Sequence, residues 1–192
     1  MDEVQVGARW VGGLREDRLD PGPLPTKENC QISRWELGTI NYEALAGLEA
    51  CVAHLASLAG EAGAGQDHRI ALARSYAALQ AHEAELSARF LSKLRPLQEE
   101  GRLTVFGPAS AADRTPTFAL ALVDGAGTGR PCLAEQLSSA GALCTHGNHY
   151  AVDLVEERLG QQDGVTRVSF LHYNTLQEVD MVADLVAKAC YN

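Results

Sequence analysis

The sequence has few lysines, an excess of acids and no long hydrophobic run. Three of its 192 residues are lysine, and acids outnumber bases 25 to 16, so the net charge is −9. Phosphate binding needs clustered Lys and Arg, so this balance argues against nucleic acid, and it argues equally against an anionic membrane surface. No apolar run approaches the ~20 residues that a membrane-spanning helix needs. With 46% hydrophobic residues, the composition is that of an ordinary globular protein.

The five cysteines are odd in number, widely spread and without CxxC spacing. This pattern suits reduced thiols in a cytosol and offers no disulfide framework. The first ten residues, MDEVQVGARW, carry acids where a signal peptide has bases, and no apolar segment follows. These features predict an intracellular, cytoplasmic protein.

The first 38 residues read as a connector, and helices follow it. LDPGPLP, at 19–25, favours an extended chain, and so long a loop-like start suggests a piece of a larger protein. Asn41 predicts the start of a helix that ends near residue 59, and a second helix is expected over 67–99, with Gly101 ending it. The predicted divisions are a connector (1–38), a linking helix region (39–66) and a C-terminal domain (67–192).

Strands and helices alternate in the rest of the chain. Pro131 is expected to be the first residue of one helix, and Tyr76, Leu79 and Phe90 are expected in the core. Thr175 and Glu178 form a capping box that predicts the start of the last helix, whose buried stripe is Val179, Val182 and Val186. The other expected elements are strands at 103–106 and 117–123, helices at 131–140 and 151–158, a short strand in ALCTH (142–146) and a strand from Arg167. This order predicts an α+β domain of two layers, with helices on one face of a sheet.

Three stretches resemble one enzyme family when they are taken together. RVSFLHYNTLQEVD (167–180) is similar to the final strand-turn-helix motif of class V aminotransferases, the fold-type I pyridoxal-phosphate (PLP) enzymes that include cysteine desulfurases. RWELGTINYEALAGLEACVAHLA (34–56) resembles the family's glutamate-Gly-Thr-x-Asn turn and the helix after it. GALCTHGNHYAVDLV (141–155) resembles the loop that carries the nucleophilic cysteine in the desulfurases. The resemblance covers about 30–192 and implies the small C-terminal domain of such an enzyme, preceded by a long helix.

The resemblance implies roles for five residues. Arg167 would bind the α-carboxylate of a small amino-acid substrate, since a guanidinium fork matches a carboxylate; the alternative is a surface arginine at the start of a strand. Thr39 and Asn41 would lie near the cofactor phosphate of a neighbouring subunit in a homodimer; the alternative is a plain turn and helix cap. His149 and Tyr150 would contact substrate; the alternative is a turn of exposed polar residues.

Two departures from the family pattern limit the expected chemistry. Tyr150 occupies the place of the desulfurase cysteine, and Cys144 lies six residues earlier. A phenol cannot replace the thiolate that attacks sulfur, so persulfide formation of the familiar kind is not expected. None of the three lysines, Lys27, Lys93 and Lys188, has the flanking residues of the family's Schiff-base lysine. The isolated chain is therefore expected to be non-catalytic.

Other interpretations of the sequence stay open at this point. A truncated copy could act as a binding or dimerisation module for a full-length homologue, or the chain could be a gene fragment. Cys144, His146 and His149 form C-x-H-x-x-H, but no fourth zinc ligand is evident, so we expect no metal site.

Overall fold

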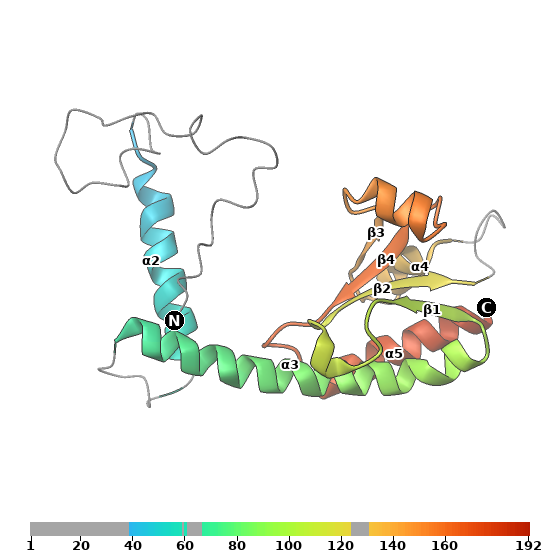
Figure 1. Ribbon diagram of the computed structural model, residues 1–192, viewed down its shortest axis with the longest axis horizontal. Coiled ribbons are helices and arrows are strands. Elements are labelled where there is room, and N and C mark those ends of the chain that lie inside the picture. The colour runs from blue at the N-terminus through green and yellow to red at the C-terminus, as the bar shows by residue number, and fades with distance from the viewer. Residues whose placement is uncertain (1–38, 59, 61–66, 124–130) are drawn as a thin grey trace. The chain divides into compact units, whose positions relative to one another are not determined.

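The computed structural model describes residues 39–58, 60, 67–123 and 131–192, which are drawn as coloured ribbon in Figure 1. The chain divides into two units between His54 and Leu55, inside helix α2 (Tyr42–Ser57). The Asn41 side chain caps this helix, because its Oδ1 accepts a hydrogen bond from the Ala44 N–H at 3.0 Å. The predicted start of the helix is confirmed.

A four-stranded antiparallel sheet and its helices form the second unit. The strands are β1 (Leu103–Phe106), β2 (Thr117–Leu122), β3 (Thr145–Gly147) and β4 (Val165–Ser169), in the spatial order β1-β2-β4-β3. The helices are α3 (His68–Glu99), α4 (Leu133–Ser139), α5 (Leu176–Tyr191), the short 3₁₀ turn η3 (Ala111–Asp113) and the π-helix η4 (Asp153–Arg158). Figure 1 shows α3 and α5 running side by side along one face of the sheet. The expected α+β, two-layer fold is confirmed.

The core lies between the sheet and these helices. Phe90 of α3, Phe118 of β2 and Phe170 after β4 are almost fully buried and pack edge to face, with ring centroids 4.8 to 6.2 Å apart. Val179 and Val186 of α5 are fully buried in the same cluster, as the stripe predicted, while Val182 is half-buried beside it. One helical layer therefore covers one face of the sheet.

Tyr76 is not a core residue, although the spacing predicted it there. Its side chain is 56% exposed. Figure 1 shows the reason, since the first half of α3 extends past the end of the sheet and only the second half lies against it. Helical spacing shows which residues share a face of a helix, but it does not show how far the neighbouring layer reaches.

The ends of most elements follow local signals in the sequence. Gly101 (φ +69°) ends α3 in a Schellman motif, in which the Arg102 N–H donates to the Leu97 carbonyl at 2.9 Å. The Thr175–Glu178 capping box is present, with the Glu178 N–H 3.2 Å from Thr175 Oγ1 and the Thr175 N–H 2.7 Å from Glu178 Oε2. Both predictions are confirmed.

Four predicted boundaries are wrong, one of them the start of the strand expected from Arg167, which is β4 and begins at Val165. Pro131 precedes α4 and is not its first residue, because the Glu135 carboxylate accepts the Cys132 N–H at 3.0 Å and fixes the start at Leu133. The strand expected over 142–146 is β3, and it pairs with β4 only over 145–147. The helix expected over 151–158 is the π-helix η4, which starts at Asp153. None of the described helices is long and apolar enough to cross a membrane.

Candidate active-site face

Arg167 lies in the middle of β4, on the sheet face that the helices leave uncovered. Burial alternates from Thr166 onward: Thr166 and Val168 are buried towards the helices, whereas Arg167 and Ser169 are exposed, and Val165 at the start of the strand is also buried. The residues directly opposite Arg167 are Ala119 on β2 and Thr145 on β3. Both are small, and directly opposed residues share a face of the sheet. The guanidinium therefore has space on both sides.

The Arg167 side chain has no hydrogen-bond or ion-pair partner among the described residues. Arg69, Arg95 and Arg158 likewise have no side-chain partner among the described residues, whereas two other arginines of this unit offer a contrast. Arg89 forms two hydrogen bonds with Asp180, at 2.8 and 2.9 Å, and Arg114 donates to the Pro108 and Thr117 carbonyls, each at 2.7 Å. Arg167 therefore keeps its planar set of donors available for an anion such as a carboxylate.

His149 and Tyr150 form the tip of a tight turn that follows β3. Both have left-handed backbone conformations, with φ of 51° and 63°, and the Ala151 N–H donates to the Asn148 carbonyl at 2.8 Å. Two positive φ values inside a hydrogen-bonded four-residue turn are the geometry of a type I′ turn. Residues other than Gly, Asn, Asp and His rarely adopt this conformation, so Tyr150 is the more unusual of the two, and such strain is concentrated at functional sites.

The turn is joined to the strand that carries Arg167. His149 Nε2 donates to the Val165 carbonyl at 3.1 Å, and Val165 lies two residues before Arg167 on β4. Two strand residues span about 7 Å. The His149 side chain is therefore bonded to β4 at a position two residues from Arg167. Tyr150 has a fully exposed side chain, and Thr39 and Asn41 belong to the other unit of the chain.

Asn148 is a residue of this region that the sequence analysis did not select. Its Oδ1 accepts the Tyr150 N–H at 3.1 Å, and its Nδ2 donates to Glu156 Oε1 of η4 at 3.2 Å. Asn is a common turn residue for this reason, because its side chain can bond its own backbone two residues on. That preference could have indicated its place in the turn, but the bond to Glu156 depends on the π-helix.

The side chains of the C-x-H-x-x-H pattern bond to protein groups. His146 Nε2 donates to the Asp163 carbonyl at 2.8 Å, so its Nδ1 accepts from the Thr166 hydroxyl at 2.9 Å. Burial raises the pKa of Cys144, with a further contribution from Cys132, so this thiol is less reactive than an exposed one. Among the described residues, no cluster of His, Cys, Asp or Glu could hold a metal ion.

The described lysines do not fit the role of a PLP Schiff base, which the resemblance implies for an upstream lysine. Lys93 Nζ lies 3.0 Å from Asp184 and 3.4 Å from Asp180, and the hydrogen bond to Asp184 raises its pKa. A Schiff-base lysine needs the opposite, an unpaired amine of lowered pKa. Lys188 lies near the end of α5 on the helical layer, away from the face of Arg167. Lys27 lies outside the described residues.

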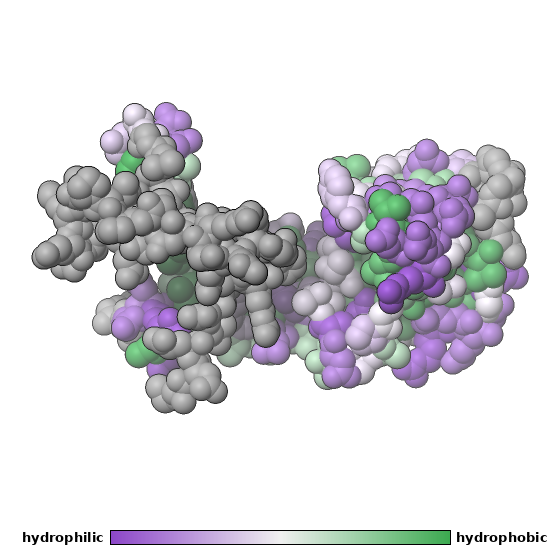
Figure 2. Space-filling model, turned by 45° about the horizontal axis from the view of Figure 1, so that its top comes forward, coloured by the Kyte–Doolittle hydropathy of each residue, from purple (hydrophilic) through white to green (hydrophobic). Residues whose placement is uncertain are grey.

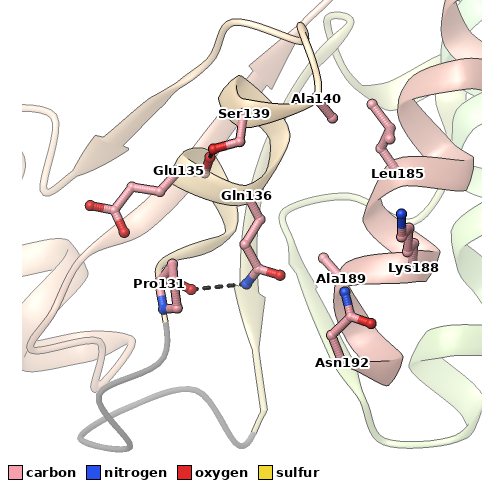
Figure 3. Close-up of a pocket in the computed structure, with 9 residues that line it drawn as sticks. All are labelled: Pro131, Glu135, Gln136, Ser139, Ala140, Leu185, Lys188, Ala189 and Asn192. Carbon is pink, nitrogen blue, oxygen red and sulfur yellow. Dashed lines mark hydrogen bonds between the residues drawn. The ribbon is translucent and has the colours of Figure 1, made fainter.

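A groove of about 590 Å³ lies elsewhere, between α4 and the end of α5. Figure 3 shows its walls, where Gln136 Nε2 donates to the Pro131 carbonyl at 2.9 Å and Lys188 projects from α5. None of the five residues with predicted roles lines this groove.

Comparisons with known proteins agree with this architecture. The sequence pattern described as aminotransferase class-V matches residues 26–182. The chain is 32% identical over 112 residues to the Aminotransferase-like protein FGM3 of Gibberella zeae, an alignment that covers 57% of this chain and 27% of that protein. The chain thus spans about a quarter of the length of this curated relative.

Solved structures of cysteine desulfurases share the fold. The apo cysteine desulfurase of Thermococcus onnurineus NA1 has a TM-score of 0.62 at 22% identity, over 83% of this chain and 34% of that one. The cysteine desulfurase CsdA of Escherichia coli has a TM-score of 0.54 at 25% identity, over 81% of this chain and 32% of that one. This chain therefore corresponds to about a third of those proteins. The match over residues 26–182 spans most of the chain, and the shared folds are consistent with it: the chain belongs to the aminotransferase class-V family.

Proposed function

We propose that this chain is the C-terminal portion of a PLP-dependent class V aminotransferase or cysteine-desulfurase-like enzyme, and that Arg167 binds the α-carboxylate of a small amino acid. The observation that carries the proposal is the unpaired guanidinium of Arg167 on the uncovered sheet face, between the small residues Thr145 and Ala119. A cation without a partner among the described residues, on the face left open by the helical layer, suits a ligand that arrives with its own carboxylate.

The direct test follows Arg167 in the full chain by NMR. Glycine should shift the Arg167 Nε–H resonance in a saturable manner, whereas methylamine, which has no carboxylate, should not. The Nε–H of Arg89, already bonded to Asp180, serves as an internal control. Arg167→Lys identifies the resonance and should weaken glycine binding, because an ammonium lacks the planar fork. An Arg167 resonance that ignores glycine would sink the proposal.

His149 and Tyr150 are proposed to contact the substrate from the turn beside Arg167. The bond from His149 to the Val165 carbonyl and the exposed phenol of Tyr150 support this role. Because Tyr150 is not a thiol and burial raises the pKa of Cys144, we do not propose a persulfide step on these residues.

We also propose that the isolated chain does not catalyse. PLP would supply an electron sink for an amino-acid carbanion, and it must be held by a lysine. The ion-paired Lys93 and the distant Lys188 support the proposal that the lysine belongs to another stretch of polypeptide. Absorbance spectra of the purified chain with PLP test it. A saturable aldimine band that borohydride abolishes, and that Lys27→Ala removes, would contradict the proposal.

The complete enzyme is proposed to be a cytoplasmic homodimer. Thr39 is exposed just before α2 and would reach the cofactor phosphate of the partner subunit, whereas the Asn41 side chain already caps that helix. The described cysteines, Cys51, Cys132, Cys144 and Cys190, are free thiols, which suits a reducing compartment.

A second candidate function is that of a non-catalytic binding or dimerisation module. The observation that favours it is the uncovered sheet face of a chain that corresponds to about a third of the desulfurase structures. Such a module would co-purify with a full-length homologue at a fixed ratio. Sedimentation of the chain alone as a monomer, with no association when that homologue is added, would remove this candidate.

A further inference from the structure

Two side-chain hydrogen bonds join the turn that carries His149 and Tyr150 to neighbouring elements. One is the His149 Nε2 bond to the Val165 carbonyl, which joins the turn to β4. The other joins Asn148 to Glu156 and therefore joins the turn to η4. Tyr150 itself makes no side-chain bond to a described residue and is fully exposed. Its position therefore depends on its neighbours.

Asn148 lies at the centre of this arrangement. Its backbone carbonyl accepts the Ala151 N–H, its Oδ1 accepts the Tyr150 N–H, and its Nδ2 donates to Glu156. A turn with two non-glycine residues at positive φ would relax to another conformation if nothing held it. The Asn148 side chain binds on both sides of the turn, so it opposes that relaxation directly.

The π-helix directs Glu156 towards the turn. Its wider hydrogen bonding is visible in the Leu159 N–H, which donates to the Leu154 carbonyl five residues earlier at 2.9 Å. The extra residue in each turn of the π-helix affects where its side chains point, because one residue more or less in a helix rotates every later side chain by about 100°. Glu156 is half-buried and also fixed through its backbone, since its carbonyl accepts Gln162 Nε2 at 2.9 Å. Figure 2, which brings η4 forward, shows a largely hydrophilic surface here with hydrophobic atoms among it, in keeping with the exposed Val152 and Leu154.

We propose that Asn148 and Glu156 are positioning residues of the Arg167 site, which hold the strained turn so that Tyr150 stands beside a carboxylate ligand on Arg167. This inference rests on the proposed role of Arg167. The inference explains three features together: two left-handed residues in the turn, a π-helix after it, and one side-chain bond between them. It adds two residues, neither of which touches the ligand, to the substrate side of the site.

The test follows Tyr150 and Arg167 in the same samples of the full chain. Tyr150 is observed by ¹⁹F NMR after 3-fluorotyrosine incorporation and is assigned with Tyr150→Phe, while Arg167 is observed through its Nε–H. Glycine is the probe. The variants are Glu156→Ala, Asn148→Asp, which keeps the acceptor for Tyr150 N–H but not the donor to Glu156, and the conservative Glu156→Gln. Glu157→Ala, an exposed neighbour in η4, is the matched control.

The wild-type chain, Glu156→Gln and Glu157→Ala should show the same glycine-dependent shift at Tyr150. Glu156→Ala and Asn148→Asp should reduce that shift severalfold, while Arg167 still binds glycine within about twofold of the wild-type affinity. An unchanged Tyr150 shift in both disruptive variants, with Arg167 still responding, would overturn this inference and leave the carboxylate site intact. Failure of Arg167 to respond in the wild-type chain would overturn the proposed function and this inference with it.

Discussion

Gly164 determines how closely β3 and β4 can approach next to the Arg167 site. It has a φ of +90°, and a Cβ at this position would lie 2.6 Å from both the Cα and the carbonyl carbon of Gly147 in β3. Alanine at positive φ costs about 1–2 kcal/mol, and forcing an extra carbon into a packed contact costs about 1–3 kcal/mol. We therefore expect Gly164→Ala to lower the free energy of unfolding by about 2–5 kcal/mol.

Gly160 offers the matched control for this prediction. Its φ is +68°, but a Cβ there would meet nothing within 4 Å. Gly160→Ala should therefore show the backbone cost alone, about 1–2 kcal/mol. Urea unfolding of both variants, followed by circular dichroism, measures the difference. Equal losses of stability in the two variants would show that the close contact of β3 with β4 is not tight, and the reasoning would fail.

Two further predictions concern the interface of α3 and α5 and the aromatic core. Hydrogen bonds from Arg89 lower the pKa of Asp180 from its ordinary 3.8 to about 2, so its stabilising effect is present above pH ~4 and is lost as the pH falls towards 2. Asp180→Asn should lower the urea midpoint at pH 7 and flatten the decline of that midpoint below pH ~4. Asp184→Asn should have a smaller effect on both, because the Asp184 carboxyl is 72% exposed. Equal pH profiles of the two variants would contradict the assignment. Phe90→Ala should cost about 3–5 kcal/mol, whereas Tyr76→Ala on the exposed part of the same helix should stay within about 0.5 kcal/mol; comparable losses in thermal unfolding would contradict the placement of the core.

Sequence predicted the elements whose determinants are local. The Thr175–Glu178 box, the Asn41 cap and Gly101 each act within one helical turn, and all three end or start a helix as expected. The alternating burial of β4 from Thr166 onward was also predictable, because a strand with one covered face repeats every two residues, whereas the burial of Val165 was not. The start of α4 was not, since Pro131 and Cys132 are both compatible with a helix start and the Glu135 carboxylate decides between them.

The missed features depend on contacts between distant segments. Tyr76 is exposed because the first half of α3 extends past the end of the sheet (Figure 1). β3 is confined to residues 145–147 by its register with β4. The π-helix was not predictable, because six residues are too few to show a periodic pattern of apolar residues in the sequence. The family motif indicated Arg167, His149 and Tyr150 as candidates, whereas the hydrogen bond between Asn148 and Glu156 depends on the fold.

The central claim is that Arg167 recognises a carboxylate, and the affinity of the full chain for glycine compared with glycine methyl ester tests it most directly. The two probes share an ammonium group and differ in the charge of the carboxyl end. A charge-assisted bidentate contact at an exposed site predicts about 5–10-fold tighter binding of glycine. Arg167→Ala should bind both probes equally weakly. If the wild-type chain binds glycine and its methyl ester equally well, or if Arg167→Ala keeps the preference, the claim is contradicted.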